Sequence, residues 1–114
     1  MKSLARIRKR QGRCYELAAR VMMDEVGADQ FTLVHGYCHT RFFGHAWIEL
    51  GDGRVFDPVL DVTWSADEYA KRLGAEAEHR YSQMEFAKLM SATRVYGPWT
   101  DDERLLTNTE EAAP

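Results

Sequence analysis

The chain has few cysteines, two in 114 residues, at positions 14 and 38. Two thiols cannot form the disulfide framework that small secreted domains use to supplement a limited core. Cys14 and Cys38 are therefore expected to be free thiols in a reducing compartment, and a single disulfide between them is the alternative.

The chain also lacks long hydrophobic runs and a large net charge. No apolar stretch approaches the roughly 20 residues that span a bilayer, and no secretory hydrophobic segment follows the basic start. The formal charge is only -3 at pH 7, so no overall field attracts nucleic acid or a membrane surface. We expect a soluble, cytoplasmic protein with no membrane partner.

The length and composition are typical of one folded domain. A hydrophobic fraction of 45% with 11% aromatics suits an ordinary core, and 114 residues are too few for two such cores. We predict a single domain over residues 1–99 and a flexible acidic tail over residues 100–114. The domain begins with a basic leader that we expect to be solvated. Its six basic side chains are Lys2, Arg6, Arg8, Lys9, Arg10 and Arg13.

Hydrophobic periodicity predicts a mixed order of helices and strands. Apolar residues recur at helical spacing over residues 14–26, which predicts an amphipathic helix. β-Branched and aromatic residues, or strict alternation, predict strands over residues 31–37, 45–50 and 54–57. Residues 38–44 are expected to form a polar-aromatic loop.

Two further helices are predicted from their capping sequences. Ser65 is placed to start a helix that runs to about Leu73, before Gly74. Ser82 is placed to start another, with Phe86 on its inner face.

Three residues offer the chemistry of an activated thiol. Cys14 stands where a helix begins, and the unpaired N–H groups of that position favour a thiolate. His45 can hold the thiolate as an ion pair and later protonate a leaving group, while Asp57 fixes the tautomer of the imidazole. The backbone N–H of Cys14 can serve as one oxyanion donor. The sequence thus predicts a site for acyl transfer.

The turn between the second and third predicted strands tests whether His45 and Asp57 can meet. A three-residue loop, Gly51-Asp52-Gly53, pairs Leu50 with Arg54 and sets Asp57 opposite Trp47, diagonal to His45. A two-residue turn would place Asp57 on the wrong face. Three-residue loops favour a left-handed glycine at their last position, where Gly53 stands.

These segments resemble the transglutaminase-like branch of the papain-like cysteine hydrolase superfamily. That branch has Gly-x-Cys-Trp/Tyr at a helix start, His-Ala-Trp-x-Glu on a strand, and Asp-Pro after the next strand. The matching residues here are 12–15, 45–49 and 57–58, in the same order, and the match spans about half the chain. The resemblance implies an α+β fold with a papain-like core, in which an N-terminal cysteine helix packs on a small antiparallel sheet with two C-terminal helices after it. It also implies that Cys14 is the nucleophile, His45 the general base and acid, and Asp57 its orienting partner.

We therefore expect a cysteine-dependent hydrolase or acyltransferase that acts on an amide, peptide or thioester bond. It would need no cofactor and no metal, and its partner would be an amide- or peptide-containing substrate. The alternative is a non-catalytic binding module of the same fold, directed to nucleic acid through the basic leader. No aromatic residues interleave with those cations, which argues against base recognition.

Some assignments stay open at this stage. Asp61 is close enough in sequence to replace Asp57 as the orienting acid, and Gln11 is a weak counterpart of the papain oxyanion glutamine. A zinc-stabilised interaction domain is a third possibility, because zinc favours histidine and cysteine ligands. The zinc hypothesis is weakened because Cys38 and His39 are adjacent, and the side chains of adjacent residues in an extended segment point to opposite sides. Its ligands would be His35, Cys38, His39 and His45.

Overall fold

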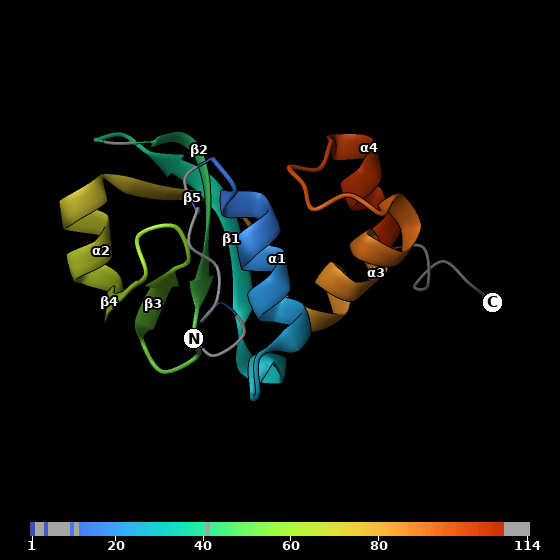
Figure 1. Cartoon of the computed structure of the whole chain (residues 1–114). Helices are drawn as coiled ribbons and strands as arrows, with labels where there is room; N and C mark the ends of the chain where they lie inside the picture. Colours follow the sequence, from blue (N-terminus) through green and yellow to red (C-terminus); the bar gives the residue numbers. More distant parts are fainter. Residues whose placement is uncertain (2–3, 5–9, 11, 41, 109–114) are drawn as a thin grey trace.

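The computed structural model describes residues 1, 4, 10, 12–40 and 42–108. These residues form a small α+β domain, a five-stranded antiparallel sheet with four α-helices around it (Figure 1). In chain order the elements are α1 (Cys14–Asp24), η2 (Ala28–Gln30), β1 (Thr32–Cys38), β2 (Phe42–Glu49), β3 (Arg54–Asp57), β4 (Val62–Ser65), α2 (Ala66–Leu73), β5 (Ala75–Tyr81), α3 (Gln83–Thr93), α4 (Asp101–Arg104) and η3 (Leu105–Asn108). The strands lie side by side in the order β4-β3-β2-β1-β5. The predicted α+β class is thus confirmed.

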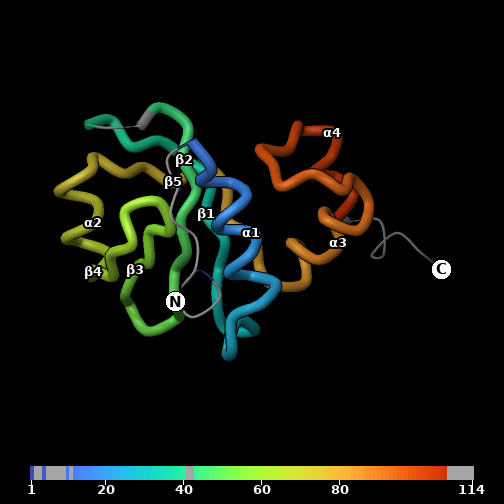
Figure 2. The backbone as a smooth tube through the Cα atoms, viewed as in Figure 1, coloured from blue at the N-terminus to red at the C-terminus, as the bar shows by residue number. Residues whose placement is uncertain are grey.

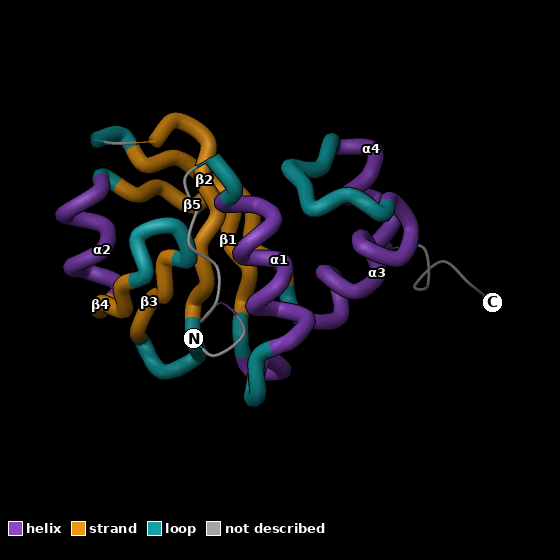
Figure 3. The backbone as a smooth tube through the Cα atoms, viewed as in Figure 1, coloured by secondary structure: helices purple, strands orange, loops and turns teal. Residues whose placement is uncertain are grey.

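The sheet separates two hydrophobic clusters. Successive residues of a strand point to opposite faces, so Trp47 and Ile48 serve different clusters. Ile48 and Phe56 belong to the cluster that also holds the buried side chains of α1 and α3. Trp47 and Val55 pack with Tyr69 of α2 on the other face. Figure 3 shows the strands between α2 on one side and α1 with α3 on the other.

The first helix follows from its apolar stripe. Leu17, Ala18 and Val21 are fully buried, and they recur at the three- and four-residue spacing of an inward face. The helix ends at Asp24, two residues earlier than we predicted, because Glu25 already has an extended backbone. Gly27, with φ of 84°, is left-handed and stands at the N-cap position of η2, while the C-cap of α1 is Glu25.

The capping sequences of the later helices are confirmed. The Ser65 hydroxyl accepts the N–H of Glu68 at 3.2 Å, and Gly74 closes α2 with φ of 61°. At the start of α3, Ser82 and Glu85 make both hydrogen bonds of a capping box. Each cap satisfies N–H groups that the helix itself leaves unpaired.

Two strands and part of a third were not predicted. β2 begins at Phe42, so the second half of the expected loop over residues 38–44 is strand. β5 was missed because its sequence, Ala-Glu-Ala-Glu-His-Arg-Tyr, has no β-branched residue and exposes its charged side chains. It pairs with β1 along an edge of the sheet, and β4 pairs with β3 along the opposite edge.

Both ends of the chain differ from expectation. We predicted a flexible tail from residue 100, but Thr100 and Glu103 form a capping box that starts α4, followed by η3 (Figure 2). Within the predicted solvated leader, Leu4 is fully buried in the core. Residues 109–114 and most of the leader, Gln11 included, lie outside the described residues.

None of the helices in the described part of the chain has the length and apolar character that crossing a membrane would require.

Candidate active site

Cys14 occupies the predicted place at the start of a helix. It is the first residue of α1 and is half-buried. Arg13 stands at the N-cap position and makes no side-chain capping hydrogen bond, since a guanidinium has no acceptor atom. The first N–H groups of a helix have no intrahelical partner. The thiol therefore lies at the positive end of the helix dipole, beside N–H groups that can receive negative charge.

His45 and Asp57 meet beneath this helix start. The imidazole Nε2 of His45 lies 2.8 Å from the carboxylate Oδ2 of Asp57. The two side chains are 1% and 0% exposed. Because Nε2 is engaged by the carboxylate, Nδ1 is the ring nitrogen left for the Cys14 thiol, with which His45 also forms a hydrogen bond. The structure thus brings the three predicted site residues together in one line.

The electrostatics of this line favour an ion pair between the ring and the carboxylate. Burial alone lowers the pKa of His45, but hydrogen bonds to Asp57 and Cys14 outweigh it and raise the pKa to about 9. Burial would raise the pKa of Asp57, yet its hydrogen bonds, first of all with His45, hold it below the ordinary value. At neutral pH the pair is therefore imidazolium and carboxylate, and Asp57 fixes which ring nitrogen faces the thiol.

Asp57 has further donors that the sequence did not reveal. Its Oδ1 accepts the backbone N–H groups of Val59 and Leu60, at 2.9 and 3.0 Å. Its Oδ2 accepts the hydroxyl of Tyr69, which is 2% exposed and lies 2.6 Å away. A buried carboxylate needs such donors to stay ionised. Tyr69 is one of the inward-facing residues of α2. The sequence alone does not show that its hydroxyl reaches Asp57, because this contact depends on how α2 packs on the sheet.

The hairpin register agrees with the prediction. Ile48 pairs with Phe56, and the N–H of Leu50 donates to the carbonyl of Arg54 at 2.9 Å, so the loop has three residues. Gly53 has φ of 87°, in the left-handed region that such a loop requires. Continuing this register places Asp57 opposite Trp47 and diagonal to His45.

Asp61 does not take the place of Asp57. It is exposed and forms an ion pair of 3.1 Å with Arg10. The same guanidinium donates to the carbonyls of Pro58, at 3.1 Å, and Leu4, at 2.9 Å. Arg10 therefore ties the segment that follows Asp57 to the start of the chain.

The four candidate zinc ligands lie in different places in the fold. His35 is buried among aromatic rings, stacked on Trp99 at 5.1 Å between centroids, and burial lowers its pKa to about 3. Cys38 is buried near the hydroxyl of Tyr69, whereas His39 is exposed in a turn and pairs with Glu76 at 2.6 Å. Both cysteines are free thiols. In the described part of the chain, no three histidine, cysteine or acidic side chains converge as a metal site would require.

Comparison of the chain with family models, with curated proteins and with solved structures gave no match.

Proposed function

We propose that this protein is a cysteine-dependent hydrolase or acyltransferase that acts on an amide, peptide or thioester bond. The observation that carries the proposal is the hydrogen-bonded line from Cys14 through His45 to Asp57. The thiol contacts the imidazole, the imidazole contacts the carboxylate, and of the three side chains only the thiol is partly open to solvent.

In the acylation step, the Sγ of Cys14 attacks the carbonyl carbon of the substrate and forms a tetrahedral oxyanion. The N–H groups at the start of α1 lie where they can stabilise this oxyanion. His45 then passes its proton from Nδ1 to the leaving amine, alcohol or thiol as the bond to the carbonyl carbon breaks. The product is a thioester between the acyl group and Cys14, and the imidazole is left neutral.

In the second step, a water molecule or an amine attacks the thioester. His45 accepts the proton of the attacking group, and the thiolate of Cys14 leaves, which restores the imidazolium–thiolate pair. With water the product is a carboxylic acid, and with an amine it is a new amide. Asp57 stays ionised throughout and stabilises the charge on the ring.

The finer description of the fold belongs to this proposal. We infer a transglutaminase-like core, in which α1 carries the nucleophile and the β2–β3 hairpin carries the other two residues. Support comes from the order of the three sequence blocks and from the three-residue loop that aligns His45 with Asp57.

The first experiment measures turnover of 4-nitrophenyl acetate, a reactive ester that any activated thiol can cleave. Purified protein should show a burst of about one nitrophenolate per chain as Cys14 is acylated, followed by slower turnover. Cys14→Ala should abolish the burst, and His45→Ala should lower its rate at least about a hundredfold. Cys38→Ala is the matched control, since it removes the other thiol and should leave the burst intact.

Alkylation by iodoacetamide at pH 6 provides an independent measurement. Cys14 should react and Cys38 should not, because burial raises the pKa of the Cys38 thiol to about 11. His45→Ala should slow the labelling of Cys14 at this pH. A burst that survives Cys14→Ala, or labelling of Cys14 that is as slow as that of Cys38, would favour a non-catalytic binding module.

A further inference from the structure

His35 is a buried histidine whose ring lacks hydrogen bonds. It lies in β1 and is 4% exposed. Neither Nδ1 nor Nε2 has a hydrogen-bond partner in the described part of the chain. A neutral imidazole carries one N–H donor and one acceptor, so both are left unsatisfied. Such groups are uncommon in folded proteins, because each loses the hydration that it has in the unfolded chain.

Three aromatic rings enclose this imidazole. Trp99 stacks on it, with 5.1 Å between the ring centroids. The rings of Tyr15 and Tyr81 meet it edge to face, at 4.8 and 5.2 Å. This enclosure favours the neutral ring, because an imidazolium here would lose water and gain no acceptor among the described residues.

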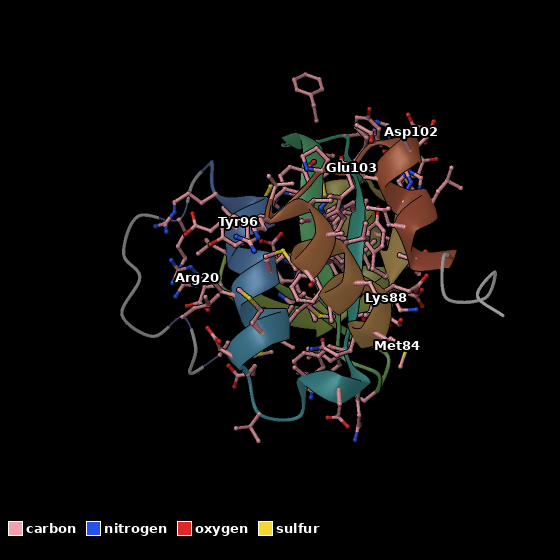
Figure 4. All side chains as sticks on the ribbon, turned by 90° about the vertical axis from the view of Figure 1, so that its right-hand side faces the viewer. Arg20, Met84, Lys88, Tyr96, Asp102 and Glu103 are labelled. Carbon is pink, nitrogen blue, oxygen red and sulfur yellow. The ribbon has the colours of Figure 1, made fainter. Side chains whose placement is uncertain are left out.

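One side of the enclosure belongs to an irregular segment. Residues 94–100, which we call the strap, connect α3 to α4 without helix or strand and include Trp99. A Cβ built on Gly97 would lie 2.6 Å from Cε1 of His35, so the backbone of the strap lies directly on the ring. Figure 4 shows α3, the strap and α4 on one side of the sheet, towards the viewer.

The hydrogen bonds of Trp99 stay within its own part of the chain. Its indole N–H donates to Thr93 Oγ1 and to the carbonyl of Val95, both at 3.2 Å. Its carbonyl accepts the guanidinium of Arg104, from α4. These bonds do not join the strap to the sheet, so the packing of Trp99 on His35 and the neighbouring rings holds it there. A segment held in this way can open without unfolding of the sheet.

The charges around His35 oppose its protonation. Burial, His79 opposite it on β5, and Arg104 together lower the pKa of His35 to about 3. The other titratable residues that line the adjacent cavity of about 190 Å³ are Tyr15, Tyr37, Glu78 and Tyr81. Of these, Glu78 would favour an imidazolium, but it is exposed and water screens its charge. On α4, the exposed Asp101 already pairs with Arg104.

We propose that the strap is a pH-sensitive cover, which packs on His35 while the ring is neutral and is released when the ring takes up a proton. In the released state the ring meets water and its pKa returns to 6.5, whereas under the strap it is about 3. The covered state is therefore fully favoured above pH 6.5 and loses this advantage as the pH falls towards 3. From pH 7 to pH 5 the ratio of released to covered molecules should rise about 25-fold. The proposal uses no chemistry of Cys14, so it is independent of the proposed function.

Hydrogen exchange of the indole N–H of Trp99, followed by NMR, tests the proposal. Each rate is divided by the rate of free indole at the same pH, and the resulting protection should fall about 25-fold between pH 7 and pH 5. His35→Leu keeps an apolar side chain under Trp99 but cannot gain a proton, so it should abolish the fall. His79→Gln is the matched control, since it removes the neighbouring imidazole and should leave the fall in place. Constant protection in the wild type, or the same fall in His35→Leu, would overturn the proposal.

A second measurement separates release of the strap from global unfolding, which also exposes the indole. The slowest amides of β1 and β2 exchange by global unfolding and become faster in low concentrations of urea. The indole of Trp99 should open with a smaller free energy than these amides and should respond little to urea. Equal opening free energies with equal urea dependence would show that the strap does not open by itself, and would refute the proposal.

An NMR titration of the His35 ring in the wild type needs no variant. The carbon and nitrogen shifts of the ring should still be those of a neutral imidazole at pH 5 in the covered state. A titration centred near pH 6.5 would show that the strap does not oppose protonation, and the proposal would fail.

Discussion

The ion pair between His45 and Asp57 makes the stability of the fold depend on pH in a way that one substitution should remove. Folding raises the pKa of His45 from 6.5 to about 9, so the folded chain holds this proton more tightly than the unfolded chain. By linkage, this difference in pKa corresponds to a contribution of about 3 kcal/mol to the free energy of unfolding. That stabilisation is fully present below pH 6.5 and is lost as the pH rises towards 9.

Asp57→Asn removes the charge that raises the pKa while keeping the size of the side chain. Burial then lowers the pKa of His45, so the ring is neutral near pH 7 in the folded variant. The variant should be less stable than the wild type at pH 6 by about 3 to 5 kcal/mol, the usual cost of breaking a buried ion pair. This loss would be a large fraction of the total free energy of unfolding of a small domain, which is about 5 to 15 kcal/mol. The deficit should narrow as the pH rises, because only the wild type loses the contribution of His45.

Urea unfolding of both proteins at pH 6, 7.5 and 9.5 provides the assay, with circular dichroism as the signal. The expected result is a free energy of unfolding that falls by about 3 kcal/mol in the wild type between pH 6 and 9.5, without that fall in Asp57→Asn. Parallel profiles for the two proteins would show that His45 and Asp57 are not coupled, and would refute the reasoning.

Three other substitutions test the supports of the site. Tyr69→Phe removes the hydroxyl that donates to Asp57 at 2.6 Å, and should lower the free energy of unfolding by about 1.5 to 3 kcal/mol with the same pH-dependent fall, measured by urea unfolding. Gly36→Ala would place a Cβ 2.1 Å from the carbonyl oxygen of Glu76, so pairing of β1 with β5 must shift, and thermal unfolding should show a loss of about 3 kcal/mol or more. Arg10→Ala breaks the hydrogen bonds and the ion pair that hold the segment after β3, and should cost about 1 to 3 kcal/mol and speed amide exchange of that segment. A variant with wild-type stability would contradict the structural role given to its residue.

The sequence by itself determined the local features of this protein. The apolar stripe of α1, the capping residues Ser65 and Ser82, and the glycine of the β2–β3 loop each act over a few neighbouring residues, and each matches its prediction. The site was partly predictable for the same reason. His45 and Asp57 lie on two strands joined by a short loop, and the length of that loop sets their register.

The tertiary structure decided what depends on contacts between distant segments. β5 has no β-branched residue, and it pairs with β1 along an edge of the sheet. Tyr69 resembles any inward-facing aromatic residue of a helix, and its role exists only because α2 packs where its hydroxyl reaches Asp57. Periodicity and capping report the neighbours of a residue along the chain, whereas burial and charge pairing depend on neighbours that only folding supplies.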